Sequence, residues 1–260
     1  MSALKKRLIT SAFFIAVTLY AIFFSPEWIF LLVIEVFALL GFYEYLTLCA
    51  KKGAAISRVP GLVLGGLLPL SVYYSSESLV LAAGTLGLLM MHFHPRSRNQ
   101  ALVGTALTVF GMIYVIWFFS HLIKIRNLEH GPFWVFFAIL LPKGGDAGAY
   151  FVGKNYGRTK LIEHISPNKS VEGALAGFVT TVALSLLSKL YLPHVAIQHL
   201  LLLGVGVGIL SQLGDLAESV IKRDVGVKDS GGVPGLGGIL DVLDSLLLTV
   251  PFVYYYITQI

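Results

Sequence analysis

Long runs of apolar residues alternate with short polar segments along the whole chain. Most of these runs are long enough to cross a hydrocarbon core about 30 Å thick as a helix. The pattern predicts an all-α polytopic membrane protein with about nine transmembrane helices, of which the third and fourth are short for a full span. The runs cover residues 8–24, 28–49, 60–74, 78–92, 101–123, 132–154, 173–192, 195–221 and 239–258.

The composition supports this class. Of the 260 residues, 56% are hydrophobic and only 13% are charged, which is too apolar for a soluble domain. Cys49 is the single cysteine, so the chain can form no intramolecular disulfide and offers no thiolate metal site. We interpret the net charge of +5 as a signal of membrane topology and expect no nucleic-acid partner.

The distribution of Lys and Arg predicts the orientation. The first run resembles a signal peptide, but no cleavage site follows Phe24, so we expect an uncleaved first helix. With a cytoplasmic N-terminus, all of the 19 Lys and Arg except Lys124, Arg126 and Lys189 fall on the cytoplasmic side. The C-terminus then lies on the opposite side, and the polar loops 155–172 and 223–238 are cytoplasmic.

Charged residues and glycines become dense in residues 211–245. Asp215, Glu218, Ser219 and Lys222 share one face if this segment is helical. The first part of that spacing recurs in Asp241, Asp244 and Ser245. The sequence DSGGVPGLGG between the two groups cannot continue either helix, and it is expected to leave backbone N–H groups free to approach a ligand.

Two earlier segments also carry candidate chemistry. Asp146 lies in an apolar run among glycines and alanines, where a charge is costly; it is either functional or paired with Lys143 for helix packing. Downstream, Asn168 or Ser170 is expected to cap a helix that has Glu172 in its first turn. A cation such as Lys169 is unfavourable at that end of a helix, so the arrangement predicts a bound phosphate.

Residues 1–130 show less chemistry. Glu35 and Glu44 are the acidic residues well inside these spans, and we interpret both as paired within the bundle or near an interface. We therefore predict that residues 1–130 are a scaffold and that residues 131–260 carry the catalytic site. No P-loop motif is present, and Gly204, Gly206 and Gly208 are expected to serve helix packing.

Three motifs resemble one family. GDAGAYFVGKNYGR, ISPNKSVEG and the element containing Ser219, Lys222, Arg223, Lys228 and Asp229 look like the phosphatidate cytidylyltransferases, also called CDP-diacylglycerol synthases. The resemblance covers about residues 140–250. It implies the reaction of CTP with phosphatidate to give CDP-diacylglycerol and pyrophosphate, at the cytoplasmic face of a bacterial inner membrane.

The resemblance also implies roles for individual residues. Phosphoryl chemistry of this kind needs positive charge, usually with Mg²⁺ held by one or two carboxylates and substrate phosphates. Mg²⁺ is expected, with Mn²⁺ as an alternative and the presence of a second ion open. The metal ligands would be Asp215, Asp241 and Asp244. The catalytic residues would be Asp215, Lys222, Arg223, Lys228 and Asp229, and the substrate-binding residues Asp146, Ser166, Asn168, Lys169, Glu172, Ser219, Gly237 and Gly238.

The chain departs from the family pattern at several positions. Leu236 stands where the family usually has His, Val242 where it usually has Arg, and the Gly-rich loop is one residue shorter. Ser170 and Val171 replace the common Thr and Trp. Because the carboxylates and the Lys-Arg pair remain, we interpret the chain as a divergent enzyme.

Two other functions fit parts of the pattern. A CTP-dependent lipid kinase would use similar residues but release CDP. A secondary transporter would also carry intramembrane carboxylates, but it predicts inverted repeats, whereas the segment 211–245 has no second copy. The expected partners are CTP, phosphatidate and membrane lipids, and a homodimer is compatible with the sequence.

Overall fold

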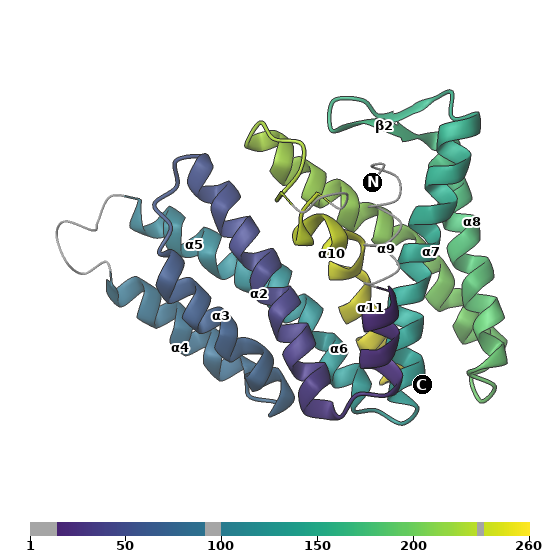
Figure 1. Ribbon diagram of the computed structural model, residues 1–260, viewed down its shortest axis with the longest axis horizontal. Helices are drawn as coiled ribbons and strands as arrows, with labels where there is room; N and C mark the ends of the chain where they lie inside the picture. The colour runs from purple at the N-terminus through teal and green to yellow at the C-terminus, as the bar shows by residue number, and fades with distance from the viewer. Residues whose placement is uncertain (1–14, 92–99, 233–236) are drawn as a thin grey trace. The chain divides into compact units, whose positions relative to one another are not determined.

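The computed structural model is almost entirely helical (Figure 1), and it describes residues 15–91, 100–232 and 237–260. A helix over residues 15–23 comes first. The elements that follow are α2 (Glu27–Lys51), α3 (Arg58–Tyr73), α4 (Glu77–Met90), α5 (Ala101–Gly111), the π-helix η3 (Met112–Trp117), α6 (Phe118–Arg126), α7 (Gly131–Tyr156), β1 (Lys160–Ile162), β2 (Ser166–Ser170), α8 (Val171–Leu187), the 3₁₀ turn η4 (Ser188–Leu190), α9 (Ile197–Asp224), α10 (Ile239–Leu247) and α11 (Thr249–Ile257).

The helices confirm an integral membrane protein. Within the described residues, 6 helical stretches are long and apolar enough to cross a membrane, and α3 and α4 are shorter apolar helices. Each predicted apolar run coincides, in its described part, with helix. The number of helices that cross the membrane and the side of each terminus stay predictions.

A small β hairpin interrupts the helical pattern and was not predicted. Strands β1 and β2 pair antiparallel, with Lys160 opposite Ser170 and Ile162 opposite Ser166. Ser170 caps α8, because its hydroxyl accepts the N–H of Gly173 at 3.1 Å. One of the two predicted capping residues is thus confirmed, while the other, Asn168, lies within strand β2.

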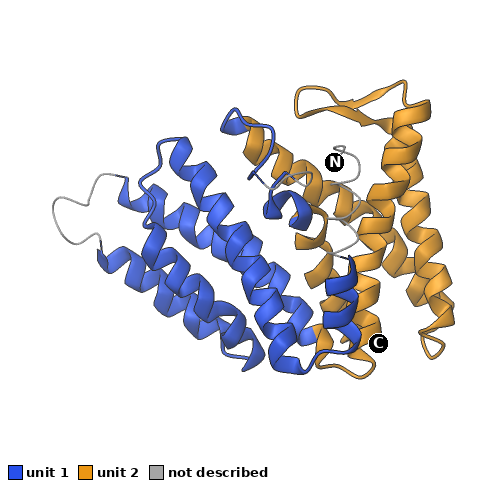
Figure 2. Cartoon of the chain, in the orientation of Figure 1, with its two compact units in different colours: residues 1–124, 224–243 blue, residues 125–223, 244–260 orange. Residues whose placement is uncertain are grey.

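The chain divides into two compact units (Figure 2). The first contains residues 1–124 and 224–243, and the second contains residues 125–223 and 244–260. The first division falls close to the predicted boundary at 130/131, but the Gly-rich loop belongs with the N-terminal helices. The assignment of a scaffold role to one part and a catalytic role to the other stays a prediction.

Glycines set the helix packing in both units, and this role was predicted for Gly204 and Gly208 of the second unit. In the first unit, a Cβ added at Gly65 would lie 2.7 Å from the side chain of Ile116. In the second unit α7 and α8 run side by side (Figure 1), and a Cβ at Gly177 would lie 2.9 Å from the carbonyl oxygen of Gly145. Gly204 and Gly208 likewise face side chains of α8 at 2.8 and 2.9 Å. These glycines let the backbones approach closely.

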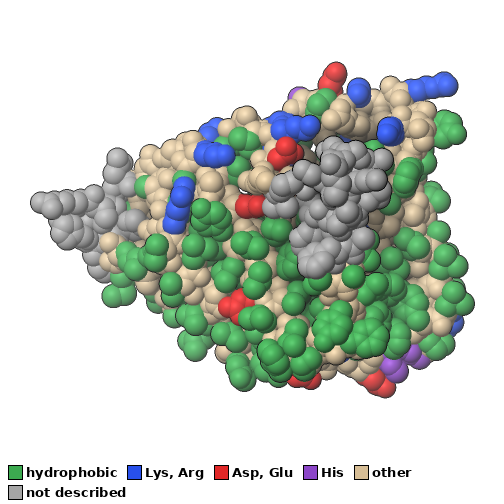
Figure 3. Space-filling view, viewed as in Figure 1, with side chains coloured by type: hydrophobic (Ala, Val, Ile, Leu, Met, Phe, Trp, Pro, Cys, Tyr) green, Lys and Arg blue, Asp and Glu red, His purple; other side chains and the backbone are tan. Residues whose placement is uncertain are grey.

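The surface of the second unit matches a membrane setting. Leu175 and Val179 on α8 are each 62% exposed, as expected for side chains that face lipid. In Figure 3, Lys and Arg gather at the end of this unit that carries the hairpin, and apolar side chains cover the flank below it.

We expect Gly177→Val to destabilise the second unit by about 1–3 kcal/mol, because the added methyl groups would collide with backbone of α7 that cannot move aside cheaply. Thermal unfolding in detergent measures this. Gly87→Val is the matched control, since nothing lies within 4 Å of a Cβ at Gly87. Equal melting temperatures for both variants would contradict the proposed packing.

Candidate functional site

A cavity of about 650 Å³ lies in the second unit, between the hairpin and helices α7, α8 and α9. Five residues singled out from the sequence line it together, although they come from three separate segments: Asp146, Ser166, Asn168, Lys169 and Asp215. Gln212 closes one side by donating to the carbonyl of Ala174 at 3.0 Å, which ties α9 to α8. The cavity is therefore the candidate active site of this unit.

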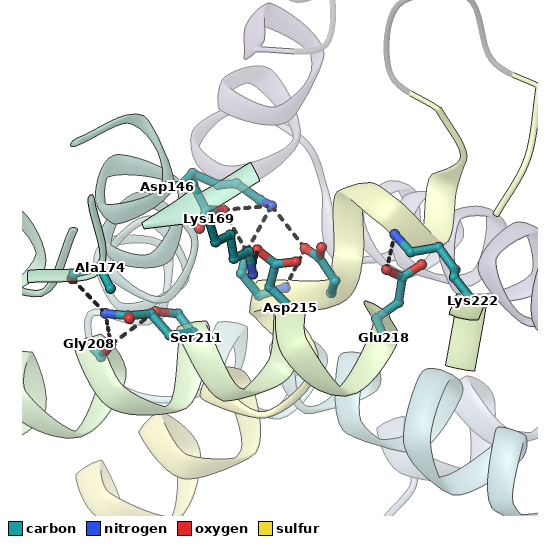
Figure 4. Close-up of polar contacts among 12 residues, drawn as sticks. Asp146, Lys169, Ala174, Gly208, Ser211, Asp215, Glu218 and Lys222 are labelled. Atoms are coloured by element: carbon teal, nitrogen blue, oxygen red, sulfur yellow. Dashed lines mark hydrogen bonds and ion pairs between the residues drawn. The ribbon is translucent and has the colours of Figure 1, made fainter. Parts of the chain in front are cut away.

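An ion pair joins two of these residues across the cavity. Lys169 reaches from β2 toward Asp215 on α9 (Figure 4), and Nζ lies 2.5 Å from Oδ2. Both side chains are partly exposed, at 27% and 29%. The charge of Lys169 near the start of α8 is thus balanced by Asp215, so a bound phosphate is not needed to explain it.

Asp146 belongs to a second polar cluster. Its Oδ2 accepts from the hydroxyl of Ser245 at 2.9 Å, and Lys143 Nζ donates to the same hydroxyl at 2.9 Å. Lys143 lies 3.5 Å from Asp146 and 3.9 Å from Asp244. The pairing of Asp146 with Lys143, considered as an alternative above, is therefore present, and Asp146 lines the cavity as well.

The close approach of α9 and α10 brings Asp215 on α9 near Asp244 on α10. A Cβ at Gly214 would lie 2.5 Å from the carbonyl oxygen of Asp244, so α10 approaches α9 closely only because residue 214 has no side chain. The negative charges of Asp215 and Asp146 both act on Asp244. Lys143 and Ser245 were not assigned to the site from the sequence; the three-residue spacing of Lys143 and Asp146 is the signal that could have placed Lys143 there.

The predicted polar face of α9 is confirmed, but two of its members pair with each other. Asp215, Glu218 and Lys222 project from the same side of α9 (Figure 4). Glu218 is fully buried and forms an ion pair with Lys222, whose side chain is 10% exposed. Ser219 is also buried. Lys222 therefore already balances a buried charge.

Two further predicted residues hold the hairpin in place. Arg223 donates from Nε to the carbonyl of Ile165 at 2.9 Å. The carboxylate of Glu172 accepts the backbone N–H groups of Arg158 and Thr159 at 3.1 and 3.2 Å. Both contacts connect the hairpin to helices that border the cavity.

The described part of the Gly-rich loop is organised around Asp241, in the first unit. One oxygen of Asp241 accepts the N–H of Gly238 at 2.7 Å, and the N–H and hydroxyl of Ser230 each at 2.9 Å. Gly237 has φ +86°, a conformation that favours glycine. Lys228 and Asp229 are exposed. Leu236 lies outside the described residues, and Val242 is half-buried on α10.

Glu44 on α2 also contacts this loop, and its pairing within the bundle was predicted although its partners were not. Its carboxylate accepts the N–H groups of Ile239 and Leu240 at 3.0 and 2.9 Å and the hydroxyl of Ser230 at 2.8 Å. A Cβ at Gly238 would lie 2.4 Å from Glu44 Oε2. Glu44 thus caps α10 from a distance of 195 residues in sequence.

The expectation that this loop offers free backbone N–H groups to a ligand is therefore wrong for two of them, Ser230 and Gly238, and the first two N–H groups of α10 are engaged as well. The N–H groups of Ser230, Gly238, Ile239 and Leu240 all donate to carboxylates of the protein. In the sequence, Glu44 stands out only as a carboxylate within an apolar helix. That feature does not identify the groups with which it pairs.

We expect Glu44→Gln to destabilise the protein by about 1–3 kcal/mol, because an amide cannot accept from N–H and hydroxyl donors with both of its terminal atoms. Hydrogen exchange at the amides of Ile239 and Leu240 should accelerate in this variant. The control is Glu35→Gln on the same helix, for which we expect neither change. Unaltered exchange in Glu44→Gln would remove Glu44 as the cap of α10.

Comparison with known proteins places the chain in a family. The family model described as "Cytidylyltransferase family" matches residues 5–260, including the N-terminal half that carries none of the motifs. The phosphatidate cytidylyltransferase of Bacillus subtilis is 44% identical over 149 residues, and the matched region spans about half of each chain, 55% of this one and 54% of the relative.

Longer matches extend this result. The phosphatidate cytidylyltransferase of Synechocystis is 33% identical over 285 residues, covering 97% of this chain and 96% of the relative. The protein of the same name from Haemophilus influenzae is 31% identical over 284 residues, covering 97% and 98%. The resemblance inferred from the three motifs is confirmed, and the chain belongs to the cytidylyltransferase family.

Proposed function

We propose that the protein is a phosphatidate cytidylyltransferase, which converts CTP and phosphatidate to CDP-diacylglycerol and pyrophosphate. One observation carries the proposal. The cavity of the second unit collects acidic, cationic, hydroxyl and amide side chains from the motifs GDAGAYFVGKNYGR and ISPNKSVEG and from α9. The cationic, hydroxyl and amide groups can bind an anionic substrate, and the carboxylates can bind a metal ion in the same cavity. The relatives named for this activity support the same conclusion.

The reaction forms one P–O bond and breaks another. An oxygen of the lipid phosphate attacks the α-phosphorus of CTP, and the bond from that phosphorus to the pyrophosphate oxygen breaks. Negative charge grows on the leaving pyrophosphate, so catalysis depends on positioning and on positive charge. We assign Lys169, Ser166 and Asn168 to the nucleotide phosphates, because they lie together on strand β2 at the cavity.

The remaining cations receive more limited roles. Arg223 donates to the carbonyl of Ile165 in the hairpin turn, and Lys222 forms an ion pair with Glu218. Lys228 and Asp229 are exposed on the loop of the first unit. The catalytic roles of Lys222, Arg223, Lys228 and Asp229 are proposed from the family motif alone. The same holds for the substrate-binding roles of Glu172, Ser219, Gly237 and Gly238.

Mg²⁺, or Mn²⁺, fits the oxygen-donor chemistry of Asp215, Asp244 and Asp146. No group of three or more His, Cys, Asp or Glu among the described residues is arranged to hold a metal ion by itself. That agrees with the way Mg²⁺ is usually bound, by one or two carboxylates together with substrate phosphates. When bound, the ion would supply positive charge to the phosphates. The ligand role of Asp241 is proposed from its sequence position.

We expect purified wild-type protein to convert CTP labelled at the α-phosphate into labelled lipid when phosphatidate and Mg²⁺ are present. Asp215→Asn should lower kcat by about 100-fold or more, because charge stabilisation at the reacting phosphate is lost. Glu163→Gln, an exposed change in the hairpin turn, is the control. Release of CDP with a phosphorylated lipid would instead identify a lipid kinase, and normal turnover in Asp215→Asn would exclude that residue from the site.

We also propose about nine transmembrane helices, a cytoplasmic N-terminus and a bacterial inner-membrane location with the site facing the cytoplasm. A reporter fused after Gly157, between α7 and β1, should then report a cytoplasmic location. One fused after Ile260 should report the opposite side. Two reporters on the same side would contradict the three spans expected between Gly157 and Ile260. Homodimerisation is likewise a proposal, for which the sequence gives no interface.

A further inference from the structure

Lys154 differs from the other lysine of the cavity. Lys169 is neutralised by Asp215. Lys154 also lines the cavity, but no carboxylate among the described residues forms an ion pair with it. Its side-chain contact is with Tyr150, one turn earlier on α7: Nζ lies 3.4 Å from the phenol oxygen and 5.6 Å from the ring centroid. The cavity therefore has a cation whose charge the described part of the protein leaves unbalanced.

The position of this pair indicates an interfacial location. Tyr150, Phe151 and Tyr156 are 60%, 64% and 71% exposed on the last turns of α7. Exposed aromatic side chains near the end of an apolar helix are typical of the level of the lipid headgroups. A lysine there can extend its ammonium to water simply as an anchor. That explanation does not account for the fact that Lys154 and Tyr150 both border the cavity.

The walls beside the pair are small and apolar. Ala149 and Gly153 lie on α7, and Gly173 and Ala174 face them from α8. These four residues have no polar side chain that could compete with a ligand for the ammonium of Lys154. A phosphate monoester brings negative charge and several acceptor oxygens, and an ammonium and a phenol hydroxyl 3.4 Å apart can both donate to it.

We propose that Lys154 and Tyr150 form a subsite for the phosphate monoester headgroup of the lipid substrate. The inference rests on the proposed function and assigns its two phosphate-bearing substrates to different parts of one cavity. The nucleotide phosphates contact Lys169, Ser166 and Asn168 on the hairpin, and the lipid phosphate contacts the end of α7. The exposed aromatic residues described above lie on the same last turns of α7 as Lys154, which favours the lipid at this subsite.

Steady-state kinetics in mixed micelles test the assignment. Lys154→Met keeps the apolar stem and removes the charge, so the KM for phosphatidate should rise about tenfold or more while the KM for CTP changes less than about twofold. Tyr150→Phe should have a smaller effect of the same kind, and Lys154→Arg should restore part of the loss. The matched control is Arg158→Met, which removes a nearby cation that does not line the cavity.

Direct binding separates this inference from the proposed function. Short-chain phosphatidate should bind the wild-type protein without CTP, and binding should weaken about tenfold in Lys154→Met; diacylglycerol, which lacks the phosphate, should bind neither. If wild type binds phosphatidate through Lys154 but makes no labelled lipid from CTP, the proposed reaction is wrong and the subsite stands. If wild type is active and Lys154→Met keeps its KM for phosphatidate, or raises only that for CTP, the subsite is wrong. Melting temperatures must match for either result to count.

Discussion

The constraint that organises this protein is the cost of placing carboxylates in an apolar helical bundle, where an uncompensated charge is strongly unfavourable. Apart from Glu35, each acidic residue discussed above inside a helix has an identified partner. Glu218 pairs with Lys222, Asp215 with Lys169, and Asp146 with Ser245 and Lys143. Glu44 uses backbone N–H groups and a hydroxyl. The same pattern recurs away from the cavity, where Glu77 pairs with Lys124.

These pairs differ in what a ligand can do to them. Lys169 and Asp215 are each more than a quarter exposed and lie in the cavity. A phosphate can therefore replace Asp215 as the partner of Lys169, and a metal ion can replace Lys169 as the partner of Asp215, without leaving a buried charge. Glu218 is fully buried, and its partner cannot be withdrawn at similar cost. Removing Lys222 would take away the cation paired with this buried carboxylate, which is expected to cost about 3–5 kcal/mol. Loss of activity in a Lys222 variant would therefore not by itself demonstrate a phosphate contact, whereas loss in a variant at Lys169 would be easier to interpret.

The parts of the fold that were predictable follow from local patterns. Apolar runs give the helices, and a four-residue spacing gives the shared face of Glu218 and Lys222. Asp215 and Lys169 were both expected at the site, but their pairing was not, because it joins two segments that carry no common signal. The hairpin was missed because a strand of five residues ending in a helix cap looks like the cap alone. The role of Glu44 depends on a contact between residues 195 apart, which no periodicity reveals.

The starts of α8 and α10 bear on where phosphate can bind. Helix N-termini commonly supply free N–H groups to anions. At α10 the N–H groups of Ile239 and Leu240 are taken by Glu44. At α8, Val171 donates to the carbonyl of Thr159 at 2.9 Å and Gly173 donates to Ser170. With these donors engaged, side chains must provide most of the positive charge. Lys154 gains importance for this reason, because its ammonium is the cavity cation with no acidic partner among the described residues.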